Sequence, residues 1–214
     1  DVTGSLDIRD SEISGNFAGY DGGGLYIGES GGPITVERTR ITNNTAYDDG
    51  GGVFMYWLGH ETTFYKCTIS GNTAYDGGGV FLYDTDSTIQ KKFVGYGYAD
   101  QALLIQNCTI SGNRADNYGG GLFLYDAEAL VKIENTTITG NSADWDGAIT
   151  LYGGYAELNF CTVAGNTADS YDGAIWVDGY AGISIKNSIV AGNSSYSGGN
   201  DDLTGSGWFD IEYS

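Results

Sequence analysis

The sequence predicts an all-β protein, a parallel β-helix wound from short repeated coils. The asparagine of a recurring I-x-x-N phrase returns at steps of 25 to 28 residues, with one longer step of 41. A run of small residues, mostly glycine, follows most of these asparagines, and a short alternating apolar stretch follows the run. Period-2 patterning broken by glycine and asparagine turns indicates strands rather than helices.

Stacking of the copies follows from their size. A repeat of about 27 residues cannot bury its own apolar face, so successive copies must cover one another. Each coil then rises by one strand spacing, about 4.8 Å, and equivalent residues form columns. For 214 residues we expect roughly eight coils in a single domain, 1–214.

Taken in order, residues 1–33 hold a partial strand and the first glycine turn, and residues 34–65 and 66–83 carry the next two copies. The long step contains an inserted loop at 84–101, which we expect on the flank of the coil, either as part of a binding face or as a passive decoration. The copies resume over 102–177, and residues 188–214 close the chain. Neither end reads as a polar cap, so we expect a longer parent chain or neighbouring subunits to cover both ends.

The charge balance restricts the possible partners. The chain has 28 acidic and 9 basic residues and a net charge of −19. Such a surface repels phosphate backbones, which argues against nucleic acid, and it favours cations or surfaces that carry them. No stretch is apolar over the length needed to span a bilayer, so we expect no membrane insertion by this segment.

Three cysteines, Cys67, Cys108 and Cys161, occupy one slot of the repeat that Thr39 and Thr136 hold in other copies. Strand alternation points this slot inward, so the simplest interpretation is a small buried core residue. A disulfide between Cys67 and Cys108, which are neighbours in the column, is the alternative.

Two phrases carry a family resemblance: D-G-A-I at 146–149 and 172–175, and T-I-S-G-N-T-A in the third copy. Together with N-S-I-V-A-G-N near the end, they resemble the repeats of polymorphic outer-membrane proteins and of other surface proteins with right-handed parallel β-helix repeats. The resemblance covers essentially the whole chain and implies a right-handed coil. It says less about function, because such repeats serve adhesins, autotransporter passengers and carbohydrate-active enzymes alike.

One column is a candidate structural ladder. Stacked side-chain amides at a turn can bond to the backbone and to the amide of the next coil. Its members are Asn16, Asn44, Asn72, Asn113, Asn141, Asn166 and Asn193.

A second column is acidic and lies just before the glycines. Carboxylates about 5 Å apart repel by roughly 1 kcal/mol in water, and a calcium ion with oxygen ligands would remove that cost. The alternative is that the carboxylates cap backbone N–H groups or turn into solvent. The members are Asp21, Asp49, Asp76, Asp146 and Asp172.

A third column is aromatic and points outward from the strand after the glycines. It would form an apolar patch larger than soluble monomers usually expose, to be covered by the insertion, another subunit or a ligand. Stacking between the rings explains part of it. The members are Tyr26, Phe54, Tyr56, Phe81, Tyr83, Phe123, Tyr125, Tyr152 and Trp176.

We therefore expect an extracellular or cell-surface module with a structural or adhesive role, self-associating and able to form end-to-end filaments. The alternative is a β-helix that binds or cleaves carbohydrate, as a polysaccharide lyase or hydrolase does, through the aromatic column and a bound cation. His60 is the only histidine, which argues against a catalytic triad or metal site built on histidines. No catalytic residue is assigned. The partners expected are further copies of the chain or surface glycans.

Overall fold

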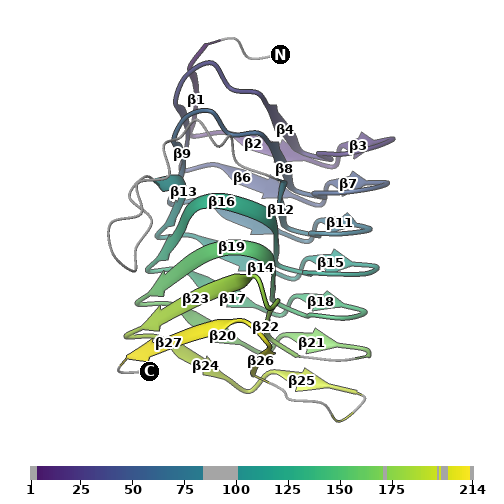
Figure 1. The fold of residues 1–214 in the computed structure, drawn as a ribbon. Coiled ribbons are helices and arrows are strands. Elements are labelled where there is room, and N and C mark those ends of the chain that lie inside the picture. The colour runs from purple at the N-terminus through teal and green to yellow at the C-terminus, as the bar shows by residue number, and fades with distance from the viewer. Residues whose placement is uncertain (1–3, 84–100, 171–172, 197, 199–201, 213–214) are drawn as a thin grey trace.

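The protein is a coil of three parallel sheets (Figure 1). The computed structural model describes residues 4–83, 101–170, 173–196, 198 and 202–212, and the insertion at 84–100 lies outside them. The two-residue strands of one of these sheets, from β3 (Phe17–Ala18) to β25 (Ser194–Ser195), stack in one column along the side of the molecule (Figure 1). No α-helix occurs in the described part of the chain.

Each sheet collects one part of every repeat. Sheet A contains β1 (Leu6–Arg9), β4 (Leu25–Gly28), β5 (Ile34–Glu37), β8 (Val53–Tyr56), β9 (Thr62–Tyr65), β12 (Val80–Tyr83), β13 (Gln101–Gln106), β16 (Leu122–Glu134), β19 (Ile149–Asn159), β22 (Ile175–Val177), β23 (Ala181–Lys186), β26 (Leu203–Gly205) and β27 (Trp208–Glu212). Sheet B contains β2 (Glu12–Ser14), β6 (Arg40–Thr42), β10 (Thr68–Ser70), β14 (Thr109–Ser111), β17 (Thr137–Thr139), β20 (Thr162–Ala164) and β24 (Ile189–Ala191). Sheet C contains β3 (Phe17–Ala18), β7 (Thr45–Ala46), β11 (Thr73–Ala74), β15 (Arg114–Ala115), β18 (Ser142–Ala143), β21 (Thr167–Ala168) and β25 (Ser194–Ser195).

The number of coils is smaller than predicted. Sheets B and C each have seven strands in the described part of the chain, which gives about six complete turns instead of roughly eight. The predicted number came from dividing the full length of 214 residues by the period, and this division includes the 13 extra residues of the long step.

The register confirms the predicted stacking. Ile69 of β10 pairs with Ile41 on one side and Ile110 on the other, and all three side chains are fully buried in one core that runs along the coil. Parallel strands in register place every inward residue above its equivalent, so one short repeat pattern builds a continuous core.

The asparagine column forms a continuous ladder. Nδ2 of Asn72 donates to Oδ1 of Asn113 at 2.9 Å and to the carbonyl oxygen of Ile41 at 3.0 Å. The backbone N–H of Asn72 donates to the same Oδ1 at 3.0 Å. These contacts recur from Asn16 through Asn193, where Oδ1 of Asp202 accepts the last pair. The ladder satisfies the polar groups of a buried corner.

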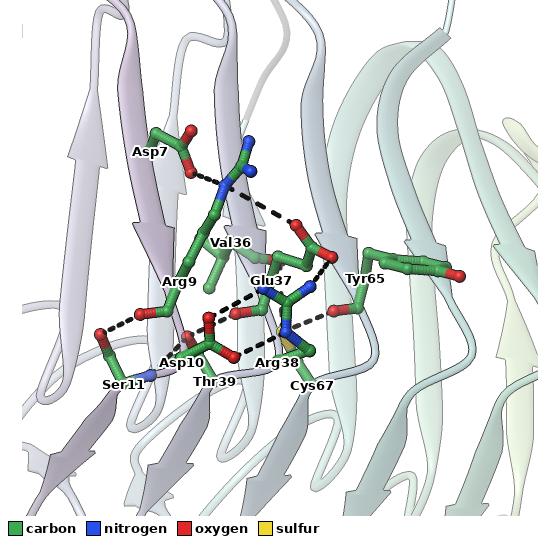
Figure 2. Close-up of polar contacts among 10 residues, drawn as sticks. All are labelled: Asp7, Arg9, Asp10, Ser11, Val36, Glu37, Arg38, Thr39, Tyr65 and Cys67. Carbon is green, nitrogen blue, oxygen red and sulfur yellow. Dashed lines mark hydrogen bonds and ion pairs between the residues drawn. The ribbon is translucent and has the colours of Figure 1, made fainter.

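The cysteine slot forms a second ladder, which the sequence analysis described only as core. In this slot the side chain donates to the carbonyl oxygen two residues earlier, as in Thr39 to Glu37 at 2.9 Å and Cys67 to Tyr65 at 3.5 Å (Figure 2). Its oxygen or sulfur accepts a backbone N–H from the preceding coil, as Sγ of Cys108 does from Cys67 at 3.3 Å. The slot therefore selects a short side chain with one donor. The three cysteines are buried free thiols.

Ion pairs lie outside this ladder at the first corners of the coil (Figure 2). Arg38 contacts Asp10 at 2.6 Å and also pairs with Glu37. The hydrogen bond from Arg38 lowers the pKa of the Asp10 carboxyl. Both side chains are exposed, so this pair contributes little to stability.

Candidate functional site

The predicted aromatic column divides into two parts in the structure. Phe54, Phe81 and Phe123 point away from the main core, yet they are buried in a second small cluster. Strand alternation correctly predicts that these side chains point away from the main core. It does not predict that Tyr56, Tyr118 and Tyr125 pack over them. The exposed aromatic patch is therefore smaller than the sequence predicts, because its phenylalanines are buried.

The outer part is a ladder of tyrosines, Tyr56, Tyr83, Tyr125 and Tyr152, which we call the tyrosine ladder. The rings of Tyr83 and Tyr125 are stacked with centroids 5.2 Å apart, and those of Tyr125 and Tyr152 are 5.1 Å apart. Tyr83 and Tyr152 are 39% and 46% exposed. The ladder presents aromatic edges to solvent along the strands β8, β12, β16 and β19.

One residue interrupts the inner part of the column. Thr150 of β19 pairs with Phe123 of β16 on one side and with Trp176 of β22 on the other. Thr150 therefore places a small side chain, itself fully buried, between two aromatic residues of the column. The Phe123 ring also leaves the stack, since its plane lies at 76° to that of Phe81.

A pocket of about 450 Å³ opens at this interruption. Strands β12, β16, β19 and β22 carry much of its wall. Its lining residues are Asp49, Asp76, Phe81, Tyr83, Tyr118, Phe123, Tyr125, Trp145, Asp146, Thr150, Tyr152 and Trp176. The pocket thus brings together most of the predicted aromatic and acidic columns.

The acidic column lies along one wall and its carboxylates accept hydrogen bonds from protein groups. Oδ1 of Asp21 accepts the backbone N–H of Asp49 at 3.3 Å, and Oδ1 of Asp76 accepts that of Tyr118 at 2.8 Å. Oδ2 of Asp146 accepts the hydroxyl of Thr150 at 2.9 Å. These contacts favour the capping role that the sequence analysis gave as the alternative to calcium.

Burial and mutual repulsion perturb the acidic column. Burial, and then the charges of Asp76, Asp21 and Asp48, raise the pKa of Asp49 to about 7. Burial also raises the pKa of Asp76 and of Asp21. A positive charge in the pocket would relieve this repulsion.

The structure does not test the calcium prediction. No group of three or more His, Cys, Asp or Glu side chains within the described ranges is arranged to hold a metal ion. Asp172, the last predicted ligand, lies outside the residues that the structure describes. Calcium binding therefore stays a prediction.

The sequence analysis missed two residues of the pocket, Tyr118 and Trp145. They lie in the turns before the glycine runs, and their rings are 5.6 Å apart. Tyr118 stands where other copies have the aspartate of the acidic column, and this departure from the repeat was the available signal.

A separate shallow groove lies on sheet C, with an aromatic rim that the sequence analysis did not single out. Phe17, Tyr47 and Tyr75 line it and are largely exposed. The recurring T-A-Y phrase was the signal for two of them.

These features define the class of the protein: a parallel β-solenoid with an aromatic and acidic pocket on one face. A family model described as the right handed beta helix region matches residues 2–168. The chain belongs to this family. The searches of curated proteins and of solved structures gave no match. Within the described residues, we find no helix with the length and apolar character needed to cross a membrane.

Proposed function

We propose that this protein is a non-enzymatic adhesive module of a cell surface, which binds glycan through the pocket at Thr150. The observation that carries the proposal is the pocket itself. Its volume of about 450 Å³ can hold a sugar-sized group, and its lining combines aromatic side chains with three carboxylates, those of Asp49, Asp76 and Asp146.

Sugars suit this combination of groups. The C–H faces of a sugar ring pack against aromatic side chains, and its hydroxyls donate to carboxylates. Ligand sites are mostly apolar cavities with a few placed polar groups, as here. The repeat phrases that resemble those of polymorphic outer-membrane proteins support a location on the cell surface.

A glycan array tests the proposal. We expect the protein to bind a restricted set of glycans and Thr150→Phe to bind none, because the phenyl ring completes the aromatic column and fills the pocket. Thr63→Phe is the matched control, since Thr63 lies on the outer side of β9 in the same sheet, away from the pocket. Equal binding by Thr150→Phe would contradict glycan binding in this pocket. Release of sugars from a bound glycan would contradict the non-enzymatic role.

End-to-end self-association is the second candidate. Ile185 is buried inside the coil, whereas its column neighbour Ile211 on the outermost strand β27 is 53% exposed. A further coil or a second molecule would cover this surface equally well. Electron microscopy of the purified protein over a concentration series tests the proposal: fibres that lengthen with concentration support it, and single particles at every concentration would refute it.

Calcium in the acidic column is a separate hypothesis with its own test. If a cation neutralises these carboxylates, a chelator will lower the melting temperature and calcium will restore it. An unchanged melt would leave hydrogen bonding to neighbouring groups as the role of the column.

A further inference from the structure

The charges of the pocket restrict its ligand more narrowly than its shape does. Three carboxylates line it, and none of its lining residues in the described chain is basic. Asp49 and Asp76 are bridge partners on adjacent coils, so their charges lie one strand spacing apart. An acidic sugar would be repelled here, and a neutral one would leave this repulsion in place.

Aromatic rings provide the second restriction. Tyr118, Trp145 and Trp176 line the pocket from different coils. The planes of Tyr118 and Trp145 are tilted by 40° against each other, whereas Trp176 stacks on Tyr152 at 23°. Rings around a cavity attract a cation to their faces, by about 0.5–2 kcal/mol for each well-placed ring. Carboxylates and aromatic faces together favour an organic cation, whose carbon atoms pack on the rings while its charge meets the carboxylates.

We propose that the pocket selects a protonated amine, so that the glycan it takes is an amino sugar whose nitrogen is not acetylated. This inference rests on the proposed glycan binding and names its substrate class. The ammonium group meets the partly exposed carboxylates of Asp49 and Asp76. Asp146 is buried and bonded to Thr150, so it contributes only its negative charge. The sugar ring packs against the aromatic lining of the pocket.

Two oligosaccharides of equal length separate charge from shape. A glucosamine tetramer carries amines, and the N-acetylglucosamine tetramer has the same backbone with neutral amides. We expect calorimetry at low salt to show at least about tenfold tighter binding of the glucosamine tetramer, equivalent to about 1.4 kcal/mol. The preference should shrink as salt is added.

Variants test whether the carboxylates of the pocket cause the preference for the glucosamine tetramer. The double variant Asp49→Asn with Asp76→Asn should reduce this preference severalfold. It should still fold, because both changes remove repulsion between neighbouring carboxylates. Asp169→Asn, in an exposed turn after β21, makes the same chemical change outside the pocket and should leave the preference unchanged. Thr150→Phe should abolish binding of both tetramers.

Equal binding of the two tetramers, with loss in Thr150→Phe, would overturn the amine inference and leave the proposed glycan binding intact. A preference that persists in the double variant would also overturn it. Failure to bind either tetramer would overturn it too, and the glycan array then decides separately whether the module binds any glycan.

Discussion

At the scale of single residues, each asparagine of the ladder holds two coils together. The side chain of Asn113 donates to the carbonyl of Ile69 and to Asn141, and its oxygen accepts two N–H groups of Asn72. A buried side chain with this many partners cannot be truncated without leaving polar groups unpaired.

We predict that Asn113→Ala lowers the free energy of unfolding by about 4 kcal/mol, because four hydrogen-bonded groups lose a partner in a buried corner. Asn16→Ala, at the exposed end of the same ladder, should cost about 1 kcal/mol. Urea denaturation of both variants measures the difference. Equal losses would mean that the ladder does not carry the stability assigned to its interior.

A second prediction concerns Asp49, whose folded-state pKa of about 7 lies above its ordinary value of 3.8. Between these values the folded protein retains a proton that the unfolded chain has released. The stability that the protonated Asp49 carboxyl contributes is therefore fully present below pH 4 and is lost as the pH rises through 7. Asp21, Asp48 and Asp76 are the charged groups that raise this pKa.

Asp49→Asn should therefore unfold with nearly the same free energy as the wild type at pH 4, and should be more stable at pH 8. After a discount for the solvent that reaches this half-buried carboxyl, we expect a difference of about 2 kcal/mol. Denaturation of both proteins at the two pH values measures it, with Asp169→Asn as the control. A difference independent of pH would show that Asp49 ionises normally.

At the scale of elements, the glycine runs allow the corner between sheets C and A to pack closely. A Cβ at Gly78 would lie 2.3 Å from the carbonyl oxygen of Arg114, which is backbone and cannot move aside. A Cβ at Gly19 would meet nothing within 4 Å. The glycine run is thus required by contact between neighbouring coils.

Gly78→Ala should lower stability by about 3 kcal/mol or prevent folding, because the added methyl group pushes two coils apart. Gly19→Ala, the same change in open space, should be close to neutral. Thermal melts followed by circular dichroism compare them. A stable Gly78→Ala variant would show that this corner is looser than the structure indicates.

The repeat explains why some of these elements could be predicted and others could not. The spacing of Asn44, Asn72 and Asn113 gave the strands, the stacking and the register, because every copy obeys the same packing rule. Alternation also gave the outward direction of Phe81. It could not show that Tyr118 packs over this region, because Tyr118 lies in a turn whose sequence differs between copies.

At the scale of the whole molecule, the regular coil supplies a scaffold and the departures from regularity supply the site. Thr150 replaces an aromatic residue, and Tyr118 replaces an aspartate. Both changes fall near the same corner of adjacent coils, where stacking turns them into one cavity. In a solenoid, residues that break a column are therefore better guides to function than residues that continue it.

The central claim is that the pocket at Thr150 binds a ligand, and tryptophan fluorescence tests this claim most directly. Trp145 and Trp176 line the pocket, while Trp57 and Trp208 do not. Titration with the glucosamine tetramer should change the fluorescence of the wild type to saturation and leave that of folded Thr150→Phe unchanged. A saturable change of equal size in Thr150→Phe, or none in the wild type, would contradict the account.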